Sequence, residues 1–502
     1  MLRLTNWLLT CVLLVNSAAA MPVKSRLFVS HYENVLGTSL EIKVSAFSEK
    51  AADAAENAAL NEIERLNGIL SAYDKKTEFS QWLTTRNRAV PVSKELFEVL
   101  SLFDQWRKQS HGALNASAEV INAVWKKAAK RHSLPTAEEL HWAVVKAQMP
   151  QWQLDPVNQT ATRLSDAPLM LNSFAKSYVI RHAVDAAIAS PEVTGVAVNI
   201  GGDIVIKGQL AESVLITDPK AHADNEIPVT SIQVSNKAIA TSGNYRRGEQ
   251  IAGNWYSHIV DPRTGQPASE VISATVVAPE ATDAGALATA FNVLSPEESK
   301  ALAAEVPGAE YLIITRDGKK ISSAGWHAME NLPAPRKQAP AISDDWNNTY
   351  EVAINFEIAL IEGMRVHRPF VAIWVEDSKG EPVRNISVWY NRERWLPELK
   401  SWNRAYGPAF YAAGSNLKTT VSSATRSPGK YTMVWDGNDD KGQPAKPGKY
   451  TIIIEAAREH GTYQIMKQEI EIKKKPSAQT FNLTGNVEIA SAVVEIRKRT
   501  GK

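Results

Sequence analysis

The sequence has 502 residues, enough for about three domains, and its 44% hydrophobic and 22% charged residues are ordinary for a globular protein. A formal net charge of +2, with no basic run interleaved with aromatic residues, gives no support for binding nucleic acid or an anionic membrane. The sole cysteine, Cys11, lies near the N-terminus, which excludes thiol catalysis and cysteine metal sites in the rest of the chain.

Residues 1–20 have the pattern of a signal peptide. Arg3 supplies a positive charge, residues 7–15 form a short apolar core, and residues 17–20 are the small residues of a cleavage site. The apolar core is too short to cross a bilayer. We therefore expect an exported protein, and a mature chain without cysteine suits an oxidising compartment.

Residues 28–332 are expected to form one α+β domain, with helices mostly in its first half and strands mostly in its second. Apolar residues at helical spacing, together with capping residues, predict five helices, at residues 49–70, 93–111, 115–131, 173–189 and 283–294. A further helix is predicted to begin at the capping box Thr136–Glu139. Strands are predicted within residues 28–44 and at residues 196–202, 213–217, 231–240, 271–278, 311–315 and 320–323, the last two joined by the turn Asp317-Gly318.

A second unit follows a linker predicted at residues 333–348. Residues 331–340 contain three prolines, which favour extended backbone. Residues 349–475 then alternate short apolar runs with turns that contain Gly and Pro, a pattern typical of an all-β sandwich. Residues 476–502 are weakly patterned and predict a tail, with at most one last strand.

Five tryptophans of the second unit allow two interpretations. They form a recognition surface, or they pack inside the sandwich. The five are Trp374, Trp389, Trp395, Trp402 and Trp435. The sequence does not say what this unit binds.

Residues 256–265 carry the strongest candidate for chemistry. A short strand leads to His258, and the Asp-Pro and Thr-Gly pairs that follow favour a tight turn. Upstream, Ser242 and Gly243 end another strand, so these strand ends form a candidate site for an anionic ligand. The competing interpretation is a hairpin with a satisfied surface histidine.

Eight short segments follow one another in an order that is typical of one protein family. They are Leu36-Gly37-Thr38, residues 70–73, 112–115, 175–178, 198–203, 241–245, 257–265 and 286–290. In this order they resemble the FAD:protein FMN transferase family, also called the ApbE or thiamine-biosynthesis lipoprotein family. His-Ile-x-Asp-Pro-x-Thr-Gly and Asn-x-Gly-Gly are the most specific motifs, and the likeness spans residues 28–332. The second unit resembles a poorly characterised β-domain that often follows this transferase domain, and its turns are similar to those of small Ig-like modules.

The resemblance implies a periplasmic enzyme that cuts FAD at its pyrophosphate. FMN is transferred to a Thr or Ser hydroxyl of a partner protein, AMP leaves, and Mg²⁺ is the expected metal. The implied partners are exported FMN-binding domains and flavin-carrying subunits of membrane redox complexes.

The resemblance also implies roles for single residues. Lys176, in the first turn of its helix, is expected to meet the pyrophosphate, and His258 to accept the proton of the acceptor hydroxyl. The competing interpretations are a solvated lysine and a structural histidine. Contacts to the flavin nucleotide are expected from Leu36, Tyr73, Ala113, Leu114, Asn115, Lys176, Ser242, Gly243 and Val260. Metal ligands are expected from Ser173, Asp283 and Thr289.

Three departures from the family pattern fall at positions of the expected phosphate and metal site. Met170 and Gly285 stand where the family usually has Asp, and Ser177 stands where it usually has Gly. The change at Gly285 removes an anionic oxygen from a hard-cation site, and Asp283 replaces it only if the turn shifts.

These departures keep other functions open. Met170 and Gly285 favour a periplasmic FAD-binding protein that has lost transfer. A further reading is an FAD pyrophosphatase, with water as the acceptor. A structural adaptor that acts through the second unit would bind no flavin at all.

Overall fold

The computed structural model of the chain describes most of both units. The described residues are 24–331, 349–359, 367–390, 393–413, 419–422, 429–458, 461–473 and 476–499. The predicted signal peptide and the predicted linker at residues 333–348 lie outside them. Among the described residues, no helix combines the length and the apolar character that a membrane span requires.

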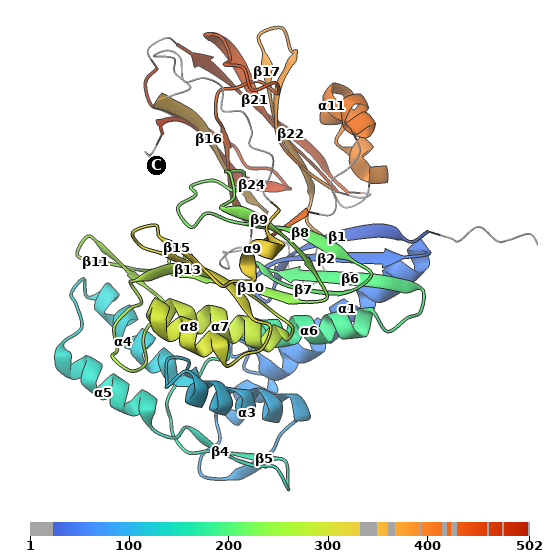
Figure 1. Ribbon diagram of the computed structural model, residues 1–502. Coiled ribbons are helices and arrows are strands. Elements are labelled where there is room, and N and C mark those ends of the chain that lie inside the picture. Colours follow the sequence, from blue (N-terminus) through green and yellow to red (C-terminus); the bar gives the residue numbers. More distant parts are fainter. Residues whose placement is uncertain are drawn as a thin grey trace, which may run out of the picture.

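An eight-stranded antiparallel sheet is the framework of the first domain (Figure 1). Its strands, in spatial order, are β1 (Arg26–Val35), β2 (Thr38–Ala46), β6 (Val193–Ile200), β7 (Asp203–Gly208), β10 (Ala238–Gly243), β13 (Val271–Ala278), β14 (Glu310–Thr315) and β15 (Lys320–Ser322). The prediction of one strand at residues 231–240 is wrong, because this segment contains the end of one strand, β9 (Thr230–Ser235), and the start of another, β10. Asn236 has a φ of 50°, which turns the chain between them.

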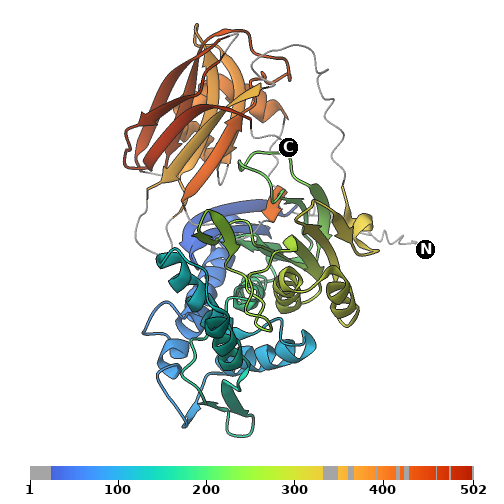
Figure 2. The same ribbon diagram turned by 90° about the vertical axis from the view of Figure 1, so that its left-hand side faces the viewer.

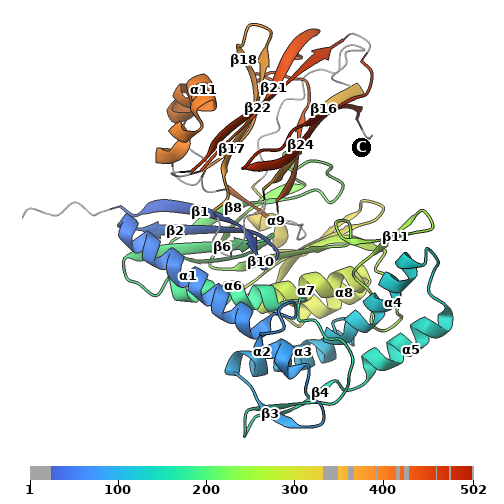
Figure 3. The ribbon, with the colours of Figure 1, turned by 180° about the vertical axis from the view of Figure 1, so that it is seen from behind.

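Three helices cover one face of this sheet: α1 (Glu49–Leu70), α6 (Ala175–Ala187) and α7 (Ala281–Val293) (Figures 1 and 3). The predicted bounds of α1 are confirmed, since Ser48 caps it and its apolar stripe is buried. α7 is buried on nearly all sides, because it packs against β10 and β13 of the sheet and has α6 beside it. The short helix α8 (Pro296–Ala304) follows it and was not predicted.

A helical layer with a small sheet extends away from these helices (Figure 1). It consists of α2 (Glu78–Trp82), β3 (Ala89–Pro91), α3 (Lys94–Gln109), η1 (Ala116–Ala118), α4 (Glu119–Lys130), α5 (Ala137–Gln148), β4 (Trp152–Asp155) and β5 (Thr160–Arg163). The predicted caps are confirmed: Ser93 accepts a hydrogen bond from the amide of Leu96, and Thr136 and Glu139 form the capping box.

The other face of the large sheet packs against β8 (Ala211–Ile216) and β9 (Thr230–Ser235). A strand from beyond the predicted linker, β19 (Thr419–Ser422), pairs with β8 in parallel. The hairpin β11 (Gly248–Ile251) and β12 (Asn254–Ser257) and the short helix α9 (Trp326–Met329) complete the domain.

The second domain is two four-stranded antiparallel sheets packed on one apolar core (Figure 2). One sheet has β20 (Lys430–Trp435), β16 (Tyr350–Ile358), β24 (Ile489–Lys498) and β23 (Gln479–Leu483). The other has β18 (Pro382–Trp389), β17 (Phe370–Asp377), β21 (Gly448–Ala457) and β22 (Tyr463–Ile472). An Ig-like topology stays a prediction. Residues 476–499 are not a tail, because β23 and β24 belong to the sandwich. The alternative of a last strand is confirmed by β24, which pairs along the length of β16.

The outer side of β17 and β21 is covered by η2 (Glu393–Glu398) and α11 (Lys400–Ala413), neither of which was predicted. Three of the five tryptophans, Trp374, Trp402 and Trp435, are fully buried, and the other two are partly buried. The interpretation of these tryptophans as packing residues is therefore correct.

The two domains meet at a buried carboxylate. Glu33, on β1, is 8% exposed and accepts hydrogen bonds from Arg368 Nε at 2.7 Å and from the hydroxyl of Tyr431 at 2.6 Å. The pairing of β19 with β8 lies at the same boundary. The sandwich therefore lies across the sheet from α1, α6 and α7 (Figure 1).

Candidate functional site

Lys176 lies where α6 meets the turn before β7. It is in the first turn of α6, and its Nζ lies 3.3 Å from Oδ2 of Asp203, the first residue of β7. The hydroxyl of Ser177 donates to the same carboxylate oxygen at 3.2 Å. Burial raises the pKa of Asp203 above its usual value, although the ammonium of Lys176 and the hydroxyl of Ser177 oppose that rise.

The Gly201-Gly202 turn brings the β1–β2 turn to this cluster. Both glycines have positive φ, 56° and 96°, and a Cβ atom on Gly201 would lie 2.6 Å from Cγ2 of Thr38. Leu36 has a φ of 49° and is half-buried beside them. The motifs that contain Leu36 and Asp203 are therefore adjacent, although they are distant in sequence.

The segment before α6 ties two further motifs together. The amide of Met170 donates to the carbonyl of Ala116, and the side-chain amide of Asn172 donates to the hydroxyl of Tyr73 at 2.9 Å. Tyr73 is 76% exposed, so it is not a core aromatic and its ring is open to a ligand.

The three predicted contact residues at 113–115 are buried. The side chain of Asn115 is used structurally: it donates to the carbonyl of Ala147 and accepts from the amide of Ser117. Ala113 and Leu114 are 3% and 1% exposed. The side chains of this segment are therefore not open to a nucleotide.

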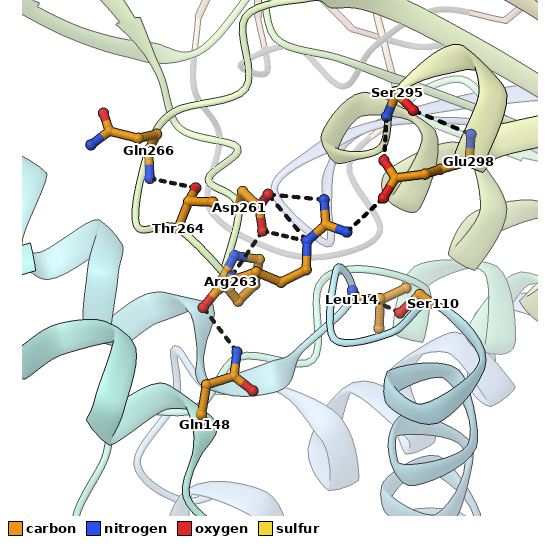
Figure 4. A network of polar contacts seen from close by, with 10 residues as sticks. Ser110, Leu114, Gln148, Asp261, Arg263, Thr264, Gln266, Ser295 and Glu298 are labelled. Atoms are coloured by element: carbon orange, nitrogen blue, oxygen red, sulfur yellow. Dashed lines mark hydrogen bonds and ion pairs between the residues drawn. The ribbon is translucent and has the colours of Figure 1, made fainter. Parts of the chain in front are cut away.

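The Asp-Pro-Arg-Thr-Gly turn is held by contacts from several elements (Figure 4). The guanidinium of Arg263 lies between Asp261, at 3.0 Å, and Glu298 of α8, also at 3.0 Å. Gln148, the last residue of α5, donates to the carbonyl of Pro262. Trp125 of α4 donates to the carbonyl of Gly265. Gly265 itself has a φ of 77°, as predicted for the Thr-Gly pair. This turn is therefore a fixed part of the domain.

His258 lies just before this turn, at the end of β12. It is exposed, and its Nδ1 lies 3.0 Å from the carbonyl oxygen of Arg247. Because a carbonyl only accepts, Nδ1 carries the proton and Nε2 of the neutral ring is left as an acceptor. Desolvation by the surrounding atoms lowers the pKa of His258 below its ordinary value.

The strand that carries Ser242 and Gly243 lies beside the Lys176 cluster. β10 pairs with β7 and β13, and the backbone amide of Thr241 hydrogen-bonds to the carboxylate of Asp203. Ser242 is half-buried and Gly243 is buried. Val260, also a predicted contact residue, is buried in the apolar cluster with Trp125 and Ile251.

The structure brings together two of the three predicted metal ligands, Ser173 and Thr289, but not Asp283. The Thr289 hydroxyl donates to the carbonyl of Ser173 at 3.0 Å, so these two oxygens are neighbours, but both are neutral. Asp283 is six residues before Thr289 on α7, which turns it about 120° away around the helix axis.

The residues present do not fit a Mg²⁺ ion, which proteins usually hold through one or two carboxylates. Among the described residues, no group of three or more His, Cys, Asp or Glu side chains is arranged to hold a metal. A Cβ atom on Gly285 would lie 2.4 Å from Oγ of Ser177, so a side chain at that position would require Ser177 to shift.

Asp203 is the residue that sequence reasoning missed. It stands inside the Asn-x-Gly-Gly motif, directly after two glycines, but no role was assigned to it. Only the tertiary structure places its carboxylate against Lys176 and Ser177. The signal in the sequence was an acidic residue at the start of an otherwise apolar strand.

Comparison with known families assigns the two domains separately. Residues 36–313 match the ApbE family, and residues 351–491 match a family described as "Predicted periplasmic protein (DUF2271)". The first match confirms the predicted family, and it covers more than half of the chain.

Relatives named FAD:protein FMN transferase are similar over the first domain. A FAD:protein FMN transferase of Treponema pallidum is 30% identical over 59% of this chain and 87% of its own length. One from Klebsiella pneumoniae is 25% identical over 56% of this chain and 82% of its length.

A solved structure has the same fold. The crystal structure of an ApbE protein from Thermotoga maritima is 25% identical, with a TM-score of 0.53 over 60% of this chain and 99% of that one. The predicted fold of the first domain is therefore confirmed.

Proposed function

Because this chain belongs to the ApbE family, we propose that it is a flavin transferase that moves FMN from FAD to a Thr or Ser hydroxyl of an exported flavoprotein. AMP is the second product. The description of the DUF2271 family as periplasmic supports the predicted signal peptide and a periplasmic site of action. Exported FMN-binding domains and flavin-carrying redox subunits are the proposed acceptors.

The observation that carries this proposal is the orientation of His258. Its Nδ1 faces the carbonyl of Arg247 at 3.0 Å, which leaves Nε2 as a proton acceptor. The lowered pKa keeps the ring neutral at pH 7, as a general base requires. The ring is also exposed, so an acceptor protein can reach it.

The reaction follows from these roles. The acceptor hydroxyl loses its proton to Nε2 of His258, and its oxygen attacks the flavin-side phosphorus of FAD. A phosphoester bond to FMN forms, the phosphoanhydride bond breaks, and AMP leaves with the electron pair of that bond.

The remaining residues bind and orient the substrate. Lys176, at the N-terminal end of α6, is proposed to offset the negative charge of the diphosphate. The exposed ring of Tyr73 is suited to stack on the flavin or the adenine. Leu36, Ser242 and Gly243 lie on the turn and strand next to Asp203, and Val260 precedes the fixed Asp261 turn.

The Mg²⁺ dependence that the family resemblance implies is not carried into this proposal, because the residues around Gly285 do not fit the ion. The same observation favours one second candidate, a periplasmic FAD-binding protein without transfer. Mg²⁺ therefore has to be a variable in the test.

The test is a transfer assay. The mature protein is incubated with FAD and an exported FMN-binding domain, in Mg²⁺ or in EDTA. An acceptor mass raised by one FMN, together with AMP, is the expected result. AMP without a mass shift indicates FAD hydrolysis with water as the acceptor. Tight FAD binding with neither product, in either buffer and with several acceptors, rejects transfer and supports the flavin-binding candidate.

A further inference from the structure

The contact between α6 and α7 decides what position 285 can hold. A Cβ atom on Gly285 would lie 2.4 Å from Oγ of Ser177 and 3.2 Å from Cβ of Phe174. The neighbours of Gly285 on α7 are fully buried against the sheet and against α6. Because a close-packed interior does not move aside freely, a side chain at 285 and the hydroxyl of Ser177 exclude each other.

The hydroxyl of Ser177 is also used. It donates to Asp203 Oδ2 at 3.2 Å, and the same oxygen lies 3.3 Å from Nζ of Lys176. The carboxylate that Ser177 contacts is therefore already paired with an ammonium. A divalent cation placed beside Asp203 would be repelled by Lys176 at short range in a partly buried site.

Two neutral oxygens remain close by, the hydroxyl of Thr289 and the carbonyl of Ser173. They hydrogen-bond to each other and bring no negative charge. Asp283 points about 120° away from Thr289 around α7. No carboxylate on the described part of α7 therefore completes this pair.

We infer that this site binds the diphosphate of FAD without a divalent cation, and that the pair Ser177 and Gly285 excludes the cation. Lys176 supplies the positive charge, and Asp203 and Ser177 hold it in place. The inference rests on the proposed function, since it concerns the same substrate and the same site.

The first test needs no variant. FAD is titrated into the full chain in EDTA and in millimolar Mg²⁺, and binding is followed by the quenching of flavin fluorescence. We expect dissociation constants that agree within about twofold. A constant tenfold or more weaker in EDTA overturns the inference alone. Absence of FAD binding in both buffers overturns the inference and the proposed function together.

The second test rebuilds a cation site. The double variant Ser177→Gly with Gly285→Asp places a carboxylate beside Thr289 and frees the volume of the hydroxyl. We expect it to bind Mn²⁺, measured by the loss of the free-ion electron paramagnetic resonance signal, and to bind FAD about tenfold more tightly with Mg²⁺ than in EDTA. Wild type and Ser177→Gly are expected to show neither effect.

The single variant Gly285→Asp is the control for the role of Ser177. With the hydroxyl in place, we expect it to bind Mn²⁺ at least tenfold more weakly than the double variant, at equal folded fraction by circular dichroism. Equal affinity in the single and double variants would contradict the claim that Ser177 excludes the ion, as would saturable Mn²⁺ binding by wild type at the same site.

Discussion

The Asp261 turn and the contact between α6 and α7 both carry residues of the proposed site, and their structures depend on the sequence in opposite ways. The turn is built largely from neighbours in sequence: Arg263 folds back on Asp261, and Gly265 supplies the positive φ. The helix contact is built from one residue on each of two helices, Ser177 and Gly285, which are far apart in the chain.

The difference shows which changes a site tolerates. Arg263 bridges Asp261 and Glu298, so a single change in the turn leaves charged partners unsatisfied. At the helix contact, the volume lost at Gly285 is taken up by the hydroxyl of Ser177. Exchanging both residues of the pair Ser177 and Gly285 therefore keeps the packing of the two helices and alters the chemistry beside them.

The largest effect is expected at His258, next to the turn. Replacement by Ala removes the general base, and we expect transfer to fall about 10²–10³-fold, which corresponds to about 3–4 kcal/mol of transition-state stabilisation. FAD binding and thermal stability are expected to stay unchanged, because the ring is exposed and makes a single hydrogen bond to backbone. Transfer is measured from AMP release and the mass of the acceptor.

The role of His258 as a base also predicts how the transfer rate changes with pH. The pKa of His258 is lowered from 6.5, so the neutral base is present at pH 7 and is lost only as the pH falls through that lower value. We expect the wild-type rate to fall with decreasing pH below 6.5. The exposed His141 on α5 provides the control, and His141→Ala should leave rate and profile unchanged. Wild-type turnover by His258→Ala would remove the role of this histidine.

The next effect concerns packing at Gly285. Gly285→Ala forces its Cβ against Ser177 and Phe174, and we expect a loss of about 2 kcal/mol in the free energy of unfolding despite the better helix propensity of Ala. Adding Ser177→Gly should restore most of it, measured by urea unfolding as a double-mutant cycle.

Gly68, an exposed helical position on α1 with no atom near its added Cβ, is the matched control. Gly68→Ala should raise stability by about 0.5–1 kcal/mol. If Gly285→Ala behaved like Gly68→Ala, the two helices would not be coupled at this contact.

Much of the fold follows from local pattern. The helix α1, the capping box at Thr136, the strand β13 and the hairpin at Asp317-Gly318 have the positions that the sequence predicts, because period, caps and turn residues specify them locally. β24 was predicted only as an alternative to a tail, because charged residues interrupt its apolar positions and its pairing with β16 comes from the other end of the domain.

Some features of the candidate site can likewise be predicted from local sequence, and others cannot. The Asn-x-Gly-Gly motif and the Asp261 turn are readable as turns, and the resemblance to a family follows from their order. The sequence also showed Ser177 and Gly285 as departures, but as two separate ones. That they touch, and that Asp203 lies between Ser177 and Lys176, depends on how α6 packs on α7 and on the sheet.

Arg263 tests the turn itself. Arg263→Ala breaks the ion pairs with Asp261 and Glu298, and we expect a loss of about 1.5 kcal/mol in stability, since Asp261 is largely buried. Because Val260 and His258 precede the turn, transfer should also fall by about tenfold, as a small displacement of the base suffices. Urea unfolding and the transfer assay measure the two effects.

Arg65 on α1 offers a comparison of the same kind. It also bridges two carboxylates, Glu62 and Glu95, but its side chain is 46% exposed. Arg65→Ala should cost at most about 0.5 kcal/mol and leave transfer unchanged. Equal losses for the two arginines would mean that the turn draws no special stability from Arg263.

The smallest effect is expected from Ser177→Ala, which removes only the hydrogen bond to Asp203. We expect a loss of about 1 kcal/mol at pH 7. The hydroxyl stabilises the ionised carboxylate, whose pKa burial already raises. Asp203 of the folded chain therefore keeps its proton at a pH where Asp203 of the unfolded chain has released it. The free energy of unfolding falls as the pH rises through the pKa that Asp203 has in the folded chain.

Without the hydroxyl of Ser177, the free energy of unfolding falls further as the pH rises. The difference in this free energy between wild type and Ser177→Ala should therefore grow from pH 4 to pH 7. Ser101→Ala is the matched control, since its hydroxyl donates to the neutral carbonyl of Phe97 and its loss should not change with pH. Urea unfolding across this range measures both differences. A difference for Ser177→Ala that stays constant would mean that its partner is not the ionised Asp203, and the charge arrangement beneath Lys176 would then differ from the one inferred here.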